Sequence, residues 1–430
     1  MENMIPLNGR IAIVDDKIEQ ALPLMRVFSK NNIPYTFYKG TDMEFLPQKP
    51  ENDIRILFLD LNLFEGRDNK PKDIQSSLYS VIKRLISPQN YPYVLIIWSL
   101  QEDRFKDLLE ELFNDRLKSC APIAIKNWIK SNFFSIETEE EVNIENEYKI
   151  IDELKKLISE MPAYRYLMQW ENCVHDSADA TLQEVFHDYH FQENWESNAN
   201  CILDMFAHSY LEQHYYDSEI DDKIKASLLF LNDVYFDTLE ASITKTDTEE
   251  TKELIHNISK EEQKKIASKI NKSLLVSNQF DSIRQPGCVI CLEPDTDKTQ
   301  HFYELLDNSI KTLPKKITKE DIYKTLIPCK VVVTPACDYA QDKLKYDRLV
   351  QGIIIDEEYG NYIDNSEAIY KSPSFEYESK CKILVLNYRY FITEYISKKL
   401  QPVFRLRNTI LAEIQSKLAR HINRQGIRNL

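Results

Sequence analysis

The stretch Ile54-Arg-Ile-Leu-Phe-Leu-Asp-Leu-Asn-Leu63 decides the predicted fold of this 430-residue chain. Its apolar run has the length of a buried strand and ends at one carboxylate, Asp60, before a turn-like segment that reaches Gly66. Open α/β sheets place their chemistry at the carboxyl ends of parallel strands. Asp60 is therefore the first candidate functional residue.

Three other apolar runs of strand length also end at polar side chains. The upstream run leads to Asp15 and Asp16, the run after Asp60 leads to Ser99, and the last one leads to Lys126. Parallel strands bring their carboxyl ends to one edge of a sheet, so we expect these side chains to lie close together.

Those side chains are the parts that a phosphorylatable aspartate needs. Asp15, Asp16 and Asp60 offer the oxygen ligands that Mg²⁺ prefers. The cation and Lys126 would neutralise the phosphoryl oxygens, and the Ser99 hydroxyl would hydrogen-bond to them. Asp60 would be the nucleophile.

Over residues 8–135, the order of these side chains resembles the receiver domain of bacterial response regulators. The resemblance implies a five-stranded parallel sheet with helices on both faces and Mg²⁺-dependent acyl phosphate formation on Asp60. It implies that the backbone carbonyl of Asn62 also binds Mg²⁺. It further implies a sensor kinase or multi-component partner protein.

The sequence departs from the family at positions that serve its switch. Asn127 follows Lys126 where the family has proline, and Ile123 stands where the family has a rotating aromatic residue. Residues 42–53 contain two prolines where a second helix is expected. These departures concern the switching mechanism more than the fold.

The composition predicts a multidomain cytoplasmic protein. A 43% hydrophobic content can fill several cores, and no apolar run approaches the length of a membrane span. The eight cysteines form no dense framework, which is typical of reduced thiols. A net charge of −15 argues against broad nucleic-acid binding, and seven glycines leave no Gly-rich phosphate loop.

We predict a receiver-like domain over residues 1–136 and an all-α domain over 137–277. The acidic run 137–147 marks the boundary, and helical spacing dominates the second segment. Glu184 and His187 have the i, i+3 spacing of metal sites in helical bundles. The alternative is ordinary surface or core histidines, which is favoured because the motif occurs once.

Residues 278–402 are predicted to form a β-rich α+β domain with a small sheet or barrel. Cys288 and Cys291 resemble half of a zinc site. Side chains three apart on a strand point to opposite faces, so buried thiols are favoured over zinc. Cys337 beside Asp338 is a candidate nucleophile, but no activating base lies near it in sequence, and a plain turn is favoured.

Residues 403–430 are predicted to form a basic amphipathic helix. It either docks on the acidic remainder of its own chain or presents a surface for nucleic acid or a partner protein. The net charge of −15 favours docking, because the rest of the chain would repel a polyanion.

The leading hypothesis is a response-regulator-like signalling protein, not an enzyme. Phosphorylation of Asp60 would control binding by the helical and β domains. One alternative is a pseudo-receiver that serves as scaffold or adaptor in a bacterial stress or defence complex. A third hypothesis is an enzyme that uses Cys337 or a metal site.

Overall fold

The computed structural model describes residues 5–6, 10–40, 43–61, 63, 71–99, 106–134, 144–187, 194–245, 259–280, 285–292, 296–340, 345–396 and 401–423. The chain forms two compact units, Met1–Phe191 with Leu231–Leu254, and Gln192–Phe230 with Ile255–Leu430. Within the described ranges, none of the helices has the length and apolar character needed to span a membrane.

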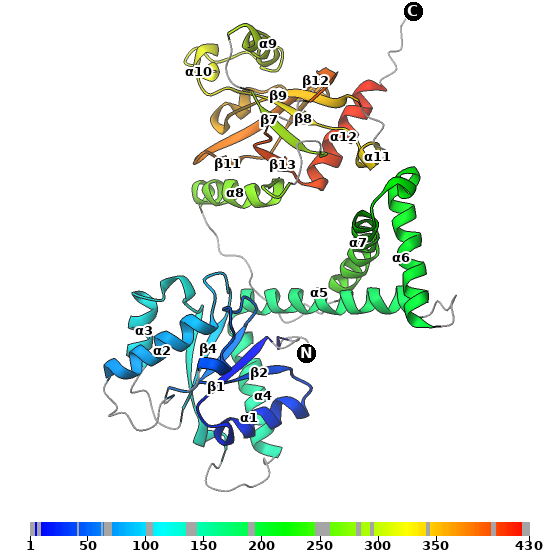
Figure 1. The fold of residues 1–430 in the computed structure, drawn as a ribbon. Coiled ribbons are helices and arrows are strands. Elements are labelled where there is room, and N and C mark those ends of the chain that lie inside the picture. Colours follow the sequence, from blue (N-terminus) through cyan, green and yellow to red (C-terminus); the bar gives the residue numbers. More distant parts are fainter. Residues whose placement is uncertain are drawn as a thin grey trace, which may run out of the picture. The chain divides into compact units, whose positions relative to one another are not determined.

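The first unit contains the predicted five-stranded parallel sheet (Figure 1). Its strand order is β2-β1-β3-β4-β5. The strands are β1 (Ile11–Asp15), β2 (Tyr35–Lys39), β3 (Ile56–Leu59), β4 (Val94–Ser99) and β5 (Ala124–Ile129). The order reverses between β1 and β3, and open α/β sheets bind ligands beyond the carboxyl ends of the strands at such a point.

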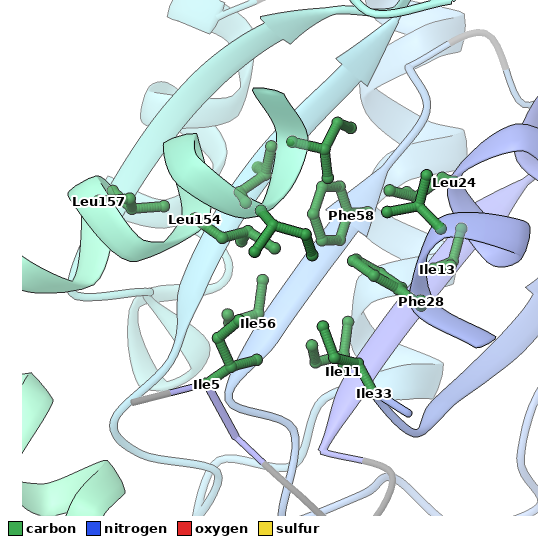
Figure 2. Close-up of a cluster of buried hydrophobic side chains, with 14 of the residues drawn as sticks. Ile5, Ile11, Ile13, Leu24, Phe28, Ile33, Ile56, Phe58, Leu154 and Leu157 are labelled. Carbon is green, nitrogen blue, oxygen red and sulfur yellow. The ribbon is translucent and has the colours of Figure 1, made fainter. Parts of the chain in front are cut away.

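Helices cover both faces of this sheet. Helices α1 (Ile18–Lys30) and α4 (Ile144–Ser159) pack on one face, where Figure 2 shows Phe28 of α1 and Leu154 of α4 with Phe58 of β3. Helices α2 (Pro71–Leu85) and α3 (Lys106–Asn114) pack on the other. Every residue of β1, β3 and β4 is buried, which explains why these strands read as continuous apolar runs.

Two local features differ from the predicted layout. The described residues of the connection from β2 to β3 form a 3₁₀ turn, η2 (Met43–Phe45), and no α-helix, since two prolines in the segment oppose a longer helix. The boundary predicted at residue 136 is too early. Helix α4 completes the core of the sheet, because its apolar residues pack against β3 and β4.

The remaining helices do not form a separate all-α domain over residues 137–277. They are α5 (Pro162–Phe186), α6 (Trp195–Leu211), η5 (Glu212–Asp217), α7 (Ile220–Thr244) and α8 (Lys260–Leu275). Tyr164 and Met168 of α5 belong to the core of the parallel sheet, and Leu275 of α8 belongs to a core of the second unit. The buried apolar clusters of the described residues include none from α6 or α7.

The second unit is built on an eight-stranded sheet in which all the described pairings are antiparallel. The main path is β10-β12-β9-β8-β7-β13-β6, and β11 pairs with β12. The strands are β6 (Val276–Ser277), β7 (Cys288–Cys291), β8 (Ile327–Val332), β9 (Asp347–Asp356), β10 (Ile369–Lys371), β11 (Phe375–Tyr377), β12 (Lys380–Glu394) and β13 (Phe404–Leu406).

Helices also cover both faces of the antiparallel sheet. Helices α8 and α12 (Asn408–Ile422) contribute to one apolar cluster, while α9 (Thr296–Asp307) and α10 (Lys319–Tyr323) contribute to another. The short elements α11 (Ala336–Ala340) and η6 (Glu357–Tyr362) connect strands of this sheet, whereas η3 (Lys118–Cys120) lies between α3 and β5 in the first unit. The predicted boundaries at 277 and 402 are therefore wrong, because α8 and the C-terminal helix pack within this unit.

Docking of α12 explains its amphipathic pattern. Leu411, Ile414 and Leu418 are buried in the cluster beneath the sheet. Arg407, just before the helix, donates from Nε to the Ser273 carbonyl of α8 at 2.7 Å. The basic segment is thus docked on its own chain over the described residues, whereas Arg424 and Arg428 lie outside them.

Candidate metal site at the carboxyl edge of the parallel sheet

Two central strands place their terminal carboxylates side by side. Asp15 ends β1, and Asp60 follows β3 directly. The parallel register pairs Val14 with Leu59, and the Asp60 backbone N–H donates to the Val14 carbonyl at 2.8 Å. The sequence prediction that these two residues meet at one sheet edge is consistent with this register.

Asp16 completes an acidic cluster with Asp15 and Asp60. Each of the three offers a carboxylate oxygen, and these oxygens lie within 4.8 Å of one another. Asp15 is completely buried, Asp60 is 2% exposed and Asp16 is 9% exposed. No other such group of three potential metal ligands occurs among the residues that the structure describes.

Lys130 places one ammonium among these carboxylates. Its Nζ donates to Asp15 Oδ2 at 2.7 Å, to Asp60 Oδ2 at 2.6 Å and to Gln20 Oε1 at 3.0 Å. Since an ammonium has three N–H donors, all of its hydrogen-bonding capacity is used. Lys130 is fully buried, so it neutralises one of three carboxylates in a region of low dielectric.

The surplus of carboxylates changes their proton affinity. Burial, followed by the nearby Asp60, raises the pKa of Asp15 to about 6, although Lys130 opposes this shift. Burial and then Asp60 likewise raise the pKa of Asp16. The Lys17 backbone N–H donates to Asp15 Oδ1 at 3.0 Å and fixes its orientation. A cation that compensates the surplus charge would reverse both shifts.

The predicted lysine, Lys126, is not at this edge. It lies inside β5 opposite Ile96, four residues before Lys130, which is about 13 Å along a strand. Its side chain is 41% exposed and its Nζ lies 3.3 Å from Glu160 Oε2. The prediction ended the strand too early, because Trp128 and Ile129 continue it.

Lys130 could have been found from the sequence by extending the last strand to its final apolar residue. With Lys130 in this place, Ser131 follows the lysine and Asn127 stands three residues before it. The proline and the rotating aromatic residue of the receiver family are therefore also absent when Lys130 takes the place of the family's lysine. The role of Gln20 of α1 could not have been predicted from the sequence, because glutamine is common on the exposed faces of helices.

Ser99 and Asn62 complete the predicted set. Ser99 ends β4, the strand next to β3, and is 3% exposed. It therefore lies at the same sheet edge as Asp60. Asn62, the predicted carbonyl ligand, lies outside the described residues.

A second, partly buried charge cluster lies at the opposite, amino edge of the sheet. Glu171 of α5 accepts two hydrogen bonds from Arg55, at 2.8 and 2.9 Å, and one from Arg10 at 2.7 Å. We call Arg10, Arg55 and Glu171 the amino-edge cluster. Arg10 also lies 2.6 Å from His175 Nε2, which must accept because arginine has only donors. Tyr164 donates to the Arg55 carbonyl at 2.7 Å, so α5 is tied to β1 and β3.

The other predicted sites receive little support from the geometry. Glu184 and His187 of α5 belong to no group of three metal ligands among the described residues. Cys288 packs in a different apolar cluster from Cys291 and Cys329, as the alternation along β7 predicts. Burial raises the pKa of Cys291 to about 11, so its thiol keeps its proton.

Cys337 lies in the helix α11 instead of the predicted turn, and its side chain is outside the described part. The neighbouring Asp338 pairs with Arg348 at 3.1 Å.

Comparisons of the chain with protein-family models, with curated proteins and with solved structures found no match.

Proposed function

We propose that the N-terminal domain is a Mg²⁺-dependent phosphoryl acceptor in which Asp60 becomes an acyl phosphate, and that this modification regulates binding by the rest of the protein. The observation that carries the proposal is the acidic cluster bridged by Lys130. The strand order of the sheet adds support, because it is one of the doubly wound orders that bind ligands at this edge.

The donor set fits a hard divalent cation. Three carboxylates face one ammonium, which leaves a formal charge of −2 when all three are ionised. Asp15, Asp16 and Asp60 would supply oxygen ligands, and solvent reaches the cluster at the partly exposed Asp16. Bound Mg²⁺ would neutralise charge on the phosphoryl oxygens.

Asp60, Lys130 and Ser99 would each have a role in the phosphoryl transfer. An Asp60 oxygen attacks the phosphorus of a phosphodonor such as acetyl phosphate, the bond from phosphorus to the acetyl oxygen breaks, and acetate leaves with the electron pair. Lys130 holds Asp60 in place and offers positive charge to the new phosphoryl oxygens. The Ser99 hydroxyl, at the end of the adjacent strand, would hydrogen-bond to one of them.

The test compares the wild type with Asp60→Asn after treatment with acetyl phosphate and Mg²⁺. Intact-mass spectrometry should show one added phosphoryl group on the wild type and none on the variant. Asp53→Asn is the matched control, because Asp53 is exposed and precedes the same strand. Modification that is unchanged in Asp60→Asn, or no modification and no Mg²⁺ binding by the wild type, would refute the proposal.

A pseudo-receiver scaffold is the second candidate function. It is favoured by the saturated hydrogen bonding of Lys130, which gives the buried charges a structural role. This function predicts that Asp60→Asn keeps every binding partner and that Mg²⁺ leaves the protein unchanged. Size-exclusion chromatography with a candidate partner, with and without beryllofluoride and Mg²⁺, separates the two functions.

A further inference from the structure

A cavity of about 380 Å³ lies in the second unit, between the segment before β10 and the C-terminal half of α12. Its volume is in the range of small-molecule sites. The cavity has no part in the chemistry proposed for Asp60, and all of its lining residues lie between 364 and 421.

Charged side chains of both signs line this cavity. Lys417, Arg420 and His421 come from α12, whereas Asp364, Glu367 and Lys371 come from the segment that ends in β10. Cations in the last turn of a helix already interact favourably with its dipole, which accounts for Arg420 and His421 in part. That explanation does not extend to the carboxylates, which come from a different segment.

The cationic side chains of the cavity differ in whether they already have a partner within the protein. Lys417 pairs with Glu413 at 2.7 Å, and Lys371 donates to the Gly360 carbonyl at 3.0 Å. The Arg420 guanidinium forms no ion pair or hydrogen bond within the described ranges. Arg420 is exposed, so a ligand in the cavity can reach it without unfolding the helix.

Several polar atoms in or beside the cavity are buried without a hydrogen-bond partner. Ser366 Oγ and His421 Nδ1 belong to lining residues. The hydroxyls of Tyr370 and Tyr388 are also buried. Both rings lie near the cavity, because Lys417 Nζ is 5.1 Å from the centre of the Tyr370 ring and the ring centres of His421 and Tyr388 are 6.1 Å apart. Burial raises the pKa of both tyrosines, so both hydroxyls remain donors. Buried polar groups are almost always paired in folded proteins.

We infer that this cavity binds a small molecule that carries an oxyanion, either phosphate or carboxylate, together with hydroxyl or amino groups. Arg420, His421 and Lys417 would take the oxyanion by charge-assisted hydrogen bonds. Asp364 and Glu367 would accept from the hydroxyl or amino groups. The docked basic helix would therefore serve a ligand site instead of a nucleic-acid surface.

Isothermal titration calorimetry of the full chain tests this inference with four probes. Glucose 6-phosphate and gluconate each combine an oxyanion with hydroxyls, whereas inorganic phosphate and glucose each carry one feature alone. We expect saturable binding of at least one of the first two, and weaker binding of the corresponding single-feature probes. The tighter of the first two identifies phosphate or carboxylate as the preferred oxyanion.

Variants then locate the binding. Arg420→Ala should weaken, by at least about tenfold, the affinity for the probe that binds, because it removes a charge-assisted contact. If glucose 6-phosphate is the bound probe, Asp364→Asn should abolish its advantage over inorganic phosphate. Replacement of an exposed lysine outside the cavity, Lys316→Ala, should not change the binding of either probe. The inference would be overturned if neither glucose 6-phosphate nor gluconate binds saturably at about 10 mM, or if binding is unaffected by Arg420→Ala.

Discussion

The two edges of the parallel sheet each hold a charge cluster, buried at the carboxyl edge and partly buried at the amino edge, and the clusters have surplus charge of opposite sign. At the carboxyl edge, the single ammonium of Lys130 pairs with two of three clustered carboxylates. At the amino edge, two guanidinium groups surround the single carboxylate of Glu171. Both clusters join segments far apart in the chain, so burial and ion pairing alone do not tell a ligand site from a structural contact.

The two clusters differ in what could compensate their surplus charge. At the amino edge, Arg10 also reaches His175 and the cluster holds α5 against the ends of β1 and β3. At the carboxyl edge, the carboxyl groups of Asp15 and Asp16 have raised pKa values. A bound proton or metal ion would compensate their surplus negative charge. A cluster that changes with pH and cations is a candidate site, whereas one that does not is a structural tie.

Lys130→Met should produce the largest change. It leaves three buried carboxylates without their ammonium, and breaking a buried pair of this kind costs about 4 kcal/mol of unfolding free energy. Urea unfolding at pH 7 measures the loss. Millimolar Mg²⁺ should recover much of it in the variant, and failure of Mg²⁺ to do so would make the carboxyl edge a structural tie like the amino edge.

Glu171→Gln tests the amino edge. Two arginines would lose their shared carboxylate, at a cost of about 3 kcal/mol, slightly less because Glu171 is 15% exposed. The matched control is Glu160→Gln, whose carboxylate is half exposed. Mg²⁺ should not restore Glu171→Gln. Recovery by Mg²⁺ would contradict the contrast between the two edges.

The pH dependence of Mg²⁺ binding should follow Asp15. Its pKa of about 6 means that Mg²⁺ must displace a proton at lower pH, so affinity should be about tenfold weaker at pH 5 than at pH 7.5. Without metal, the raised pKa favours the folded state in acid. This contribution is fully present below about pH 4 and is lost as the pH rises through about 6. Calorimetric titrations at several pH values measure the affinity, and a flat profile would rule out Asp15 as a ligand.

Lys126→Ala should have the smallest effect, below about 1 kcal/mol, because its contact with Glu160 is exposed. Thermal unfolding and Mg²⁺ affinity should both stay near wild type. A loss of Mg²⁺ affinity comparable to that of Asp60→Asn would return Lys126 to the site and displace Lys130.

The sequence predicted the carboxyl edge better than the amino edge for a physical reason. Asp15 and Asp60 end runs of fully buried strands, whose apolar residues make the ends visible. β5 is half-buried along its whole length, so its polar residues obscured its end and led to Lys126 instead of Lys130.

Contacts between distant segments carried no such signal. Glu171 lies 116 residues from Arg55 and 161 from Arg10, and nothing local distinguishes it from a surface glutamate. The apolar spacing of α4 predicted a helix but not the sheet on which it packs. The same limit hid the cavity beside α12, which requires the segment before β10 to fold against the helix.

The half-buried character of β5 also bears on amide hydrogen exchange. β1 and β3 are central and completely buried, so their amides should exchange only when the whole domain opens. β5 is one of the two edge strands, and its amides should exchange through smaller, local openings. We therefore expect the carboxylates of Asp15 and Asp60 to stand on slowly exchanging backbone, and Lys130 to follow a strand that opens locally. A local opening could withdraw the ammonium and leave the acidic ligands in place.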